Sequence, residues 1–447
     1  MYDVVILGGG PGGYVAAIRL SQLGKKVAVV EKEELGGTCT NKGCIPTKAM
    51  LTSAHLYRDI REKAKKFGIK VEGVSFELSS IMKHMQKSVT MSRKGIEFLM
   101  KKNKIDVFKD EGVLKDNETV LLKKSGEEIK GRHLILAQGS VPVIFPPFDG
   151  VPGIWTSDDV FKMDKLPESI LIIGGGVIGI EFATFFSTFD VDVTIVELAE
   201  HILPFEDIDV AEEIKKELKK KKVKVIEGEK VEEVIKGEKG YVVKLKDKEF
   251  EVEKVLLAVG RRPNITEDVI NLGINVDKGI VTDNHMRTNI ENIYAIGDIR
   301  GQIMLAHVAM YEGIVAAHNI AGEKKEMDYS AVPSIIFSNP EIASVGIKEG
   351  DVNKESINVW KFPVSANGRA RTMEEKVGFA KVIEDKKTGK VLGVTIVSPS
   401  ATDMIMEGVL AVRYKMTAHQ VAEAIHPHPT LTETLLGAFE GKWSIHI

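Results

Sequence analysis

Cysteine is almost absent from this chain of 447 residues, since Cys39 and Cys44 are the only two. A zinc site needs about four Cys or His ligands, so with no third cysteine we predict no metal site. A disulfide kept only for stability is disfavoured, because a loop this short would restrict the unfolded chain very little. Two interpretations stay open at this point: a pair of inert buried thiols, or a redox-active pair.

The chain also lacks a long apolar run and a large net charge. Its longest apolar stretches, such as SILIIGGGVIGI, are broken by glycines, and none reaches the roughly 20 residues that a membrane span needs. The formal net charge is -3, which gives no indication of a nucleic-acid partner. The first residues, MYDVVILGGG, show no basic segment or cleavage site, so we expect a cytoplasmic protein without a membrane partner.

Two segments carry the same glycine pattern between two apolar strands. Glycines let the backbone approach a pyrophosphate at a helix N-terminus, and an acid after the second strand accepts hydrogen bonds from a ribose. The acids are Glu31 and Glu197. The glycines are Gly8, Gly10 and Gly13 in the first unit and Gly174, Gly176 and Gly179 in the second. The repeat predicts two dinucleotide sites, each in a domain of its own.

Glu197 also predicts which dinucleotide the second unit prefers. A carboxylate suits the free 2′-hydroxyl of NAD and would repel the extra phosphate of NADP. The following residues, LAEHILPFED, contain no arginine that would hold that phosphate. We therefore predict NAD at the second site.

The spacing of the two cysteines bears on their chemistry. In an ideal helix, residues five apart point about 140° away from each other, so a bridge requires the helix to start or distort between them. Gly43 permits such a distortion, and Pro46 disturbs the next turn. A bridge held in a constrained turn is expected to be reducible, which favours the redox-active pair.

Several motifs together resemble one enzyme family. They are GGTCTNKGCIPTK, GRRPN, IYAIGD, LAHVAMYEG, PEIASVG, SANGRA and HPTLTE. With the two glycine units, they make the chain similar over nearly its whole length to the pyridine nucleotide–disulphide oxidoreductases, and most similar to the branch that oxidises dihydrolipoyl groups. The resemblance implies an α/β fold with two Rossmann-like dinucleotide-binding domains, for FAD and NAD, and a C-terminal α+β dimerisation domain.

On this basis we divide the chain into four regions. They are an FAD-binding domain (1–143), an NAD-binding domain (144–263), a central segment that completes the FAD site (264–330) and an interface domain (331–447). Hydrophobic periodicity adds expected helices over 54–69, 79–103, 209–225 and 402–416, and a sheet in the interface domain that includes FAKVIED and VLGVTIV.

The resemblance implies a role for each residue around the cysteine pair. Cys39 would be the thiol that attacks the substrate side, and Cys44 the thiol that lies against the flavin ring. Lys48 follows one helical turn later and would lie beside the reactive flavin nitrogen, paired with Glu181.

The resemblance also implies the cofactor contacts. For FAD they are Gly8, Gly10, Gly13, Glu31, Gly37, Thr38, Lys48, Gly112, Gly139, Asp298, Met304, Leu305, Ala306 and His307. For NAD they are Gly174, Gly176, Gly179, Glu197, Val231 and Gly260. Asp298 would bind the ribityl chain, and His307 would anchor backbone rather than transfer protons. Gln138 departs from the threonine usual in the family.

Thiol–disulfide exchange needs a base and an acid, and histidine can serve as both near neutral pH. The family pattern places that role on His428, oriented by Glu433, and leaves His426 a structural role. In the family this histidine reaches the disulfide of the other subunit, which implies a homodimer with a shared active site. The implied protein partner is the lipoyl domain of a dihydrolipoyl acyltransferase, or the glycine cleavage H protein. The alternative is an NAD(P)H-dependent reductase of a different low-molecular-weight disulfide.

Overall fold

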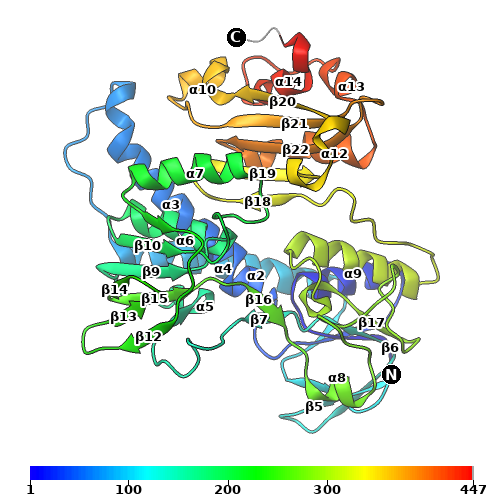
Figure 1. Cartoon of the computed structure of the whole chain (residues 1–447). Helices are drawn as coiled ribbons and strands as arrows, with labels where there is room; N and C mark the ends of the chain where they lie inside the picture. Colours follow the sequence, from blue (N-terminus) through cyan, green and yellow to red (C-terminus); the bar gives the residue numbers. More distant parts are fainter. Residues whose placement is uncertain (445–447) are drawn as a thin grey trace.

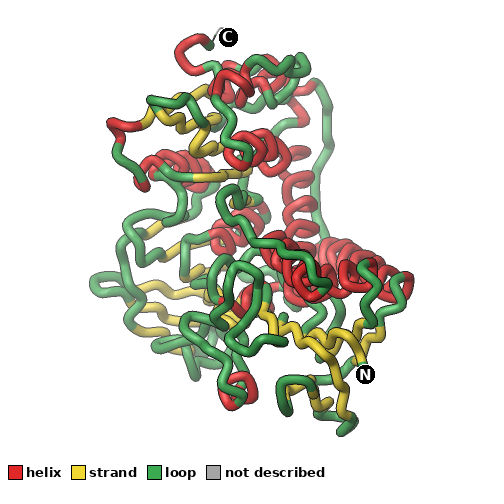
Figure 2. The backbone as a smooth tube through the Cα atoms, turned by 90° about the vertical axis from the view of Figure 1, so that its right-hand side faces the viewer, coloured by secondary structure: helices red, strands yellow, loops and turns green. Residues whose placement is uncertain are grey.

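The computed structural model describes residues 1–444 and contains two units built on parallel sheets and a C-terminal region built on a five-stranded antiparallel sheet (Figure 1). The two parallel-sheet units lie in the lower part of the view, and the antiparallel sheet lies above them. Figure 2, turned by 90°, keeps the same vertical order. The last three residues of the interface domain, 445–447, lie outside the described residues.

The first sheet has the strand order β3-β2-β1-β6-β5-β4, and β17 also pairs with β6. Its central strands pair in parallel, and β1 is buried from Val4 to Leu7, as a strand covered on both faces must be. Because β17 comes from the central segment, that segment is part of this first unit. The strands are β1 (Tyr2–Leu7), β2 (Val27–Val30), β3 (Asp106–Phe108), β4 (Gly112–Leu114), β5 (Thr119–Leu122), β6 (Glu128–Leu136) and β17 (Ile293–Ala295).

Helices α1 (Pro11–Gln22) and α9 (Ala306–Ile320) pack against each other beside this sheet. Their backbones approach closely, since a Cβ on Gly313 would lie 2.6 Å from the Gly12 carbonyl oxygen. The remaining helices of this unit are α2 (Gly37–Lys42), α3 (Cys44–Glu62), α4 (Leu78–Lys102) and α8 (Glu267–Asn271).

The second sheet is parallel throughout, in the order β11-β10-β9-β15-β8. A three-stranded antiparallel sheet (β12–β14) accompanies it, and the pair β7 (Ser140–Pro142) and β16 (Arg261–Pro263) joins the first unit to the second. The other strands are β8 (Trp155–Thr156), β9 (Ser169–Ile173), β10 (Asp192–Val196), β11 (Lys224–Ile226), β12 (Glu233–Lys236), β13 (Tyr241–Lys244), β14 (Glu249–Val252) and β15 (Lys254–Leu257). The helices are α5 (Ser157–Val160), α6 (Val177–Thr188) and α7 (Ile208–Lys220).

The C-terminal sheet is antiparallel, in the order β18-β19-β22-β21-β20, which confirms the sheet expected there. Its strands are β18 (Ser334–Ile336), β19 (Glu341–Gly346), β20 (Ile357–Pro363), β21 (Phe379–Asp385) and β22 (Val391–Ser398). Its helices are α10 (Gly368–Thr372), α11 (Ala401–Met404), α12 (Met406–Arg413), α13 (Ala418–Ala422) and α14 (Glu433–Phe439).

Three helix predictions need correction. The helix expected over 402–416 is two helices, α11 and α12, separated at Ile405. The helix expected over 209–225 ends at Lys220, because the chain turns through Lys222 at a φ of 62° and enters β11. The helix expected over 54–69 is the second half of α3, which starts at Cys44 and ends at Glu62.

A buried lysine ties the second unit to the C-terminal sheet. Lys381 on β21 is fully buried, and its Nζ lies 2.7 Å from Asp207, 2.9 Å from Asp209 and 2.8 Å from Glu349. These three carboxylates form an acidic cluster whose centre is filled by an ammonium group. Among residues 1–444, no helix is both long enough and apolar enough to cross a membrane.

Candidate active site

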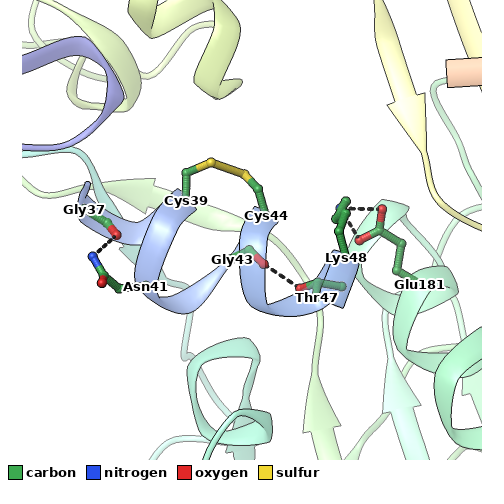
Figure 3. Close-up of a disulfide and its surroundings, with 8 residues drawn as sticks. All are labelled: Gly37, Cys39, Asn41, Gly43, Cys44, Thr47, Lys48 and Glu181. Carbon is green, nitrogen blue, oxygen red and sulfur yellow. Dashed lines mark hydrogen bonds and ion pairs between the residues drawn. A yellow bond between two sulfur atoms is a disulfide. The ribbon is translucent and has the colours of Figure 1, made fainter. Parts of the chain in front are cut away.

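The two cysteines form a disulfide across a break between two helices (Figure 3). Helix α2 ends at Lys42, α3 begins at Cys44, and Gly43 between them adopts φ −152° and ψ −107°. A Cβ on Gly43 would lie 3.1 Å from the Thr38 carbonyl oxygen, so the turn has little room for a side chain. The distortion expected at this glycine is present, and it brings the two Cα atoms to 4.7 Å.

The two glycine loops have matching geometry. In the first, the Glu31 carboxylate accepts hydrogen bonds from the Gly9 N–H at 2.7 Å and the Glu33 N–H at 2.8 Å. In the second, Glu197 accepts from the Gly175 N–H at 2.6 Å and the Ala199 N–H at 2.7 Å. Each acid is thus held beside its loop, with lone pairs left over for ribose hydroxyls.

The glycines of each loop divide their tasks. A Cβ on Gly13 would lie 1.9 Å from the Gly8 carbonyl oxygen, and one on Gly179 would lie 2.0 Å from the Gly174 carbonyl oxygen. The third glycine therefore permits close packing of helix on strand. The nearest atom to a Cβ on Gly10 would lie 3.8 Å away, and Gly10 lines a cavity, so the backbone is open to a ligand there.

The cavity, of about 410 Å³, extends from the first glycine loop to the disulfide. Its lining comes from both parallel-sheet units and includes the disulfide itself. Of the residues expected to contact FAD, it includes Gly8, Gly10, Glu31, Gly37, Thr38, Lys48, Gly112, Gly139, Asp298, Met304 and Ala306. An open glycine backbone, an acid held for a ribose and a carboxylate further along fit a flavin dinucleotide.

Asp298 belongs to a hydrogen-bond network that the sequence did not predict. Its carboxylate accepts a 2.6 Å hydrogen bond from the Ser140 hydroxyl, which in turn accepts one from Arg261 Nε at 2.9 Å. Arg261 also donates to the Ser140 carbonyl oxygen and to Thr38 Oγ1. Burial raises the pKa of Asp298, although Ser140 and Arg261 act in the opposite direction. Arg261 lies in the GRRPN motif, so this motif could have indicated Arg261 as a residue of the site.

Lys48 and Glu181 meet from separate parallel-sheet units, one on α3 and the other on α6. Lys48 Nζ lies 2.8 Å from both carboxylate oxygens, and the Glu181 side chain is only 6% exposed (Figure 3). Both residues line the cavity beside Cys44. Glu181 therefore holds the Lys48 ammonium in a fixed position at the meeting point of the two parallel-sheet units.

His428 and Glu433 form their own pair elsewhere. His428 Nδ1 lies 2.8 Å from Glu433 Oε1, and the imidazole is 78% exposed. The segment between α13 and α14, which carries His428, lies at the end of the molecule away from α2 (Figure 1). Within residues 1–444, neither member of the pair lines the cavity. The single chain therefore brings together the disulfide, Lys48 and Glu181, but not His428.

The remaining candidates have more ordinary surroundings. His426 is 6% exposed and contacts the Ala424 carbonyl oxygen and Glu407. His307 Nε2 lies 3.0 Å from the Pro333 carbonyl oxygen, and burial lowers its pKa, so it anchors backbone. Val231 is buried in the core of the second unit. The side-chain oxygen of Gln138 is buried without a hydrogen-bond partner among the described residues.

Comparison with known proteins identifies the family. The model of the pyridine nucleotide-disulphide oxidoreductases matches residues 2–313, and that family's dimerisation domain matches residues 332–439. The chain belongs to this family. Together the two matches cover the two parallel-sheet units and the C-terminal sheet, so the enzyme is a flavoprotein oxidoreductase that uses FAD and NAD and carries a dimerisation domain.

Curated relatives extend over almost the whole enzyme. A dihydrolipoyl dehydrogenase from Bacillus subtilis is 42% identical, with 97% of this chain and 96% of the relative covered. A dihydrolipoyl dehydrogenase from Geobacillus stearothermophilus is 40% identical, with 98% and 95% covered.

Solved structures with the same fold are more distant in sequence. LpdA from Mycobacterium tuberculosis is similar at a TM-score of 0.91 and 26% identity, with 98% of each chain covered. RclA, a HOCl-induced flavoprotein disulfide reductase from Escherichia coli, is similar at a TM-score of 0.89 and 28% identity, with 98% of this chain and 99% of RclA covered.

Proposed function

We propose that the enzyme is a dihydrolipoyl dehydrogenase: it oxidises protein-bound dihydrolipoyl groups and passes the electrons to NAD. The observation that carries this proposal is the Cys39–Cys44 disulfide in the wall of a cavity that both dinucleotide units share. The identity of about 40% with dihydrolipoyl dehydrogenases over almost the full length supports the choice of substrate.

In the first half of the reaction, one substrate thiolate attacks Cys39 Sγ, and Cys44 leaves as a thiolate. The second substrate thiol then attacks the sulfur bonded to Cys39. This step releases the oxidised cyclic disulfide and a thiolate on Cys39. Two electrons now reside on the cysteine pair, and the two thiol protons have left the substrate.

We assign proton transfer to His428 of the partner subunit, with Glu433 holding the imidazole in place through the 2.8 Å contact. Two observations support this assignment: the imidazole is 78% exposed, and residues 332–439 match the family's dimerisation domain. The proposed enzyme is therefore a homodimer with two shared active sites. We also propose that it acts in the cytoplasm. Its proposed protein partner is the lipoyl domain of a dihydrolipoyl acyltransferase, or the glycine cleavage H protein.

The second half returns the cysteines to the disulfide. Bound FAD would supply the two-electron transfer between the reduced cysteine pair and NAD. Lys48 and Glu181 keep a fixed charge pair at the wall of the cavity, and Asp298, Ser140 and Arg261 fix the position of the Thr38 side of α2. Glu197, held beside its glycine loop by the Gly175 N–H, would bind the ribose of NAD.

The test is NADH formation from NAD with dihydrolipoamide, with NADP measured in parallel and glutathione disulfide with NADPH as a second pair. We expect fast NADH formation with dihydrolipoamide and at least about tenfold less with NADP. The likeness to RclA supports one alternative, an NAD(P)H-dependent reductase of another disulfide. Activity only with NADPH and a low-molecular-weight disulfide would favour that alternative and contradict the proposal.

A further inference from the structure

Phe337 lies just after β18, and its aromatic ring faces the ammonium group of Lys48. Lys48 Nζ lies 4.6 Å from the ring centroid, within the range of a cation–π contact. The same ammonium lies 2.8 Å from both oxygens of Glu181. Lys48 is therefore held by a carboxylate and by the face of an aromatic ring.

Phe337 also contacts the carboxylate itself. Its backbone N–H donates to Glu181 Oε1 at 3.1 Å. One residue thus contacts both members of the pair, the ammonium through its ring and the carboxylate through its backbone. Lys48 comes from α3, Glu181 from α6 and Phe337 from the C-terminal domain. Residues of three domains therefore meet at the Lys48 ammonium group.

The surroundings of Phe337 leave the ring little freedom. The next residue, Ser338, is 2% exposed, and its hydroxyl donates to the Pro340 carbonyl oxygen at 2.6 Å. Ile336 on the other side is buried in the core that also contains Met50 of α3 and Phe182 of α6. The position of the ring is therefore set by the packing of the C-terminal domain on both parallel-sheet units.

We propose that Phe337 is a positioning residue, which fixes the Lys48 ammonium in the wall of the cavity and so supports the exchange of electrons between flavin and NAD. The inference rests on the proposed function for that role, but the contact itself can be tested in any state of the enzyme. Phe337 acts through Lys48 and does not line the cavity within residues 1–444.

The test compares Phe337→Leu, which removes the ring but keeps apolar bulk and the backbone N–H, with Phe337→Tyr, which keeps the ring. A matched control exists in the same domain. Lys361 Nζ lies 3.4 Å from the Phe379 ring centroid and 3.1 Å from Asp209 Oδ2, so Lys361 is also held between a ring and a carboxylate. Phe379→Leu removes that ring contact without touching Lys48.

The first measurement is the fraction of each lysine acetylated by a limiting reagent in the FAD-bound enzyme, read by mass spectrometry. We expect Phe337→Leu to raise labelling of Lys48 about three- to tenfold, and Phe337→Tyr to leave it at the wild-type level. Phe379→Leu should raise labelling of Lys361 and leave Lys48 unchanged. Unchanged Lys48 labelling in Phe337→Leu would overturn the proposal.

The second measurement is the rate of flavin reduction by NADH in a stopped-flow instrument. Phe337→Leu should slow it about three- to tenfold, and Phe337→Tyr should keep the wild-type rate. An equal loss in Phe379→Leu would reduce Phe337 to a structural role. Neither measurement uses a dihydrolipoyl substrate, so a wild-type enzyme inactive with dihydrolipoamide would contradict the proposed function and leave this test readable.

Discussion

Glu31 and Glu197 hold the same place in two copies of one βαβ unit. Each carboxylate accepts a hydrogen bond from the N–H of the residue after the first glycine of its loop, from Gly9 at 2.7 Å and from Gly175 at 2.6 Å. The two copies differ in their surroundings. Glu31 lines the cavity that contains the disulfide, whereas Glu197 does not.

Because the two acids are equivalent, replacing each with glutamine should weaken the binding of a different cofactor: NAD for Glu197 and FAD for Glu31. Glu197→Gln removes the charge that holds a ribose, so we expect the KM for NAD to rise about tenfold and the preference over NADP to fall, with FAD retained. Glu31→Gln should weaken retention of FAD, measured by flavin released on gel filtration, and leave the KM for NAD unchanged. Equal effects of both variants on both cofactors would contradict the assignment of one loop to each.

The cysteines should differ once the disulfide is removed. Cys39→Ser and Cys44→Ser should each abolish oxidation of dihydrolipoamide, because exchange needs both sulfurs. If Cys44 lies against the flavin, Cys39→Ser should keep a long-wavelength thiolate–flavin absorbance, and Cys44→Ser should lose it. The visible spectrum of each variant is the measurement, and the reverse pattern would exchange the two roles.

His428→Ala should slow dithiol exchange by about 10²- to 10⁴-fold, the usual contribution of a positioned acid–base group. Reduction of the flavin by NADH should change little, because no thiol of the substrate takes part. His426→Gln is the matched control: its imidazole is buried against Ala424 and Glu407, so its loss should lower stability more than exchange. Mixed dimers of His428→Ala and Cys39→Ser chains should recover activity at one of two sites if the site is shared.

Lys381→Met should lower the free energy of unfolding by about 3–5 kcal/mol at pH 7, because it leaves three carboxylates facing one another. Burial acts against the charged form of Asp209, but the hydrogen bonds from Lys381 and Lys361 outweigh it and lower its pKa. A lowered carboxyl pKa stabilises the fold above the ordinary carboxyl range, and that stabilisation is lost as the pH falls.

The wild type and Lys381→Met should therefore approach each other in stability below about pH 4. Urea unfolding at pH 7 and in acid measures both effects. A constant difference between the two proteins across this range would show that the carboxylates are not what the lysine stabilises.

Much of the fold could be predicted because it depends on the order of residues within short segments. The strand–glycine–helix–strand order and the acid that follows it are set by residues within one short segment, and both copies fold as expected. The break at Gly43 was also predictable, since helix geometry alone forbids a bridge between Cys39 and Cys44 in an uninterrupted helix. Element ends were less predictable, because periodicity runs on through Ile405 and from α7 into β11 without a local stop signal.

Local patterns in the chain were enough to select the residues proposed for the chemistry: two cysteines, a lysine one turn later, two glycine loops and a His–Glu pair five residues apart. Only the tertiary structure decided which of them meet. Lys48 reaches Glu181 across 133 residues, and Phe337 joins them from the segment after β18. The segment between α13 and α14, which carries His428, lies at the end of the molecule away from α2. The physical reason is that local spacing governs turns and helices, whereas contacts between domains depend on how their buried surfaces pack.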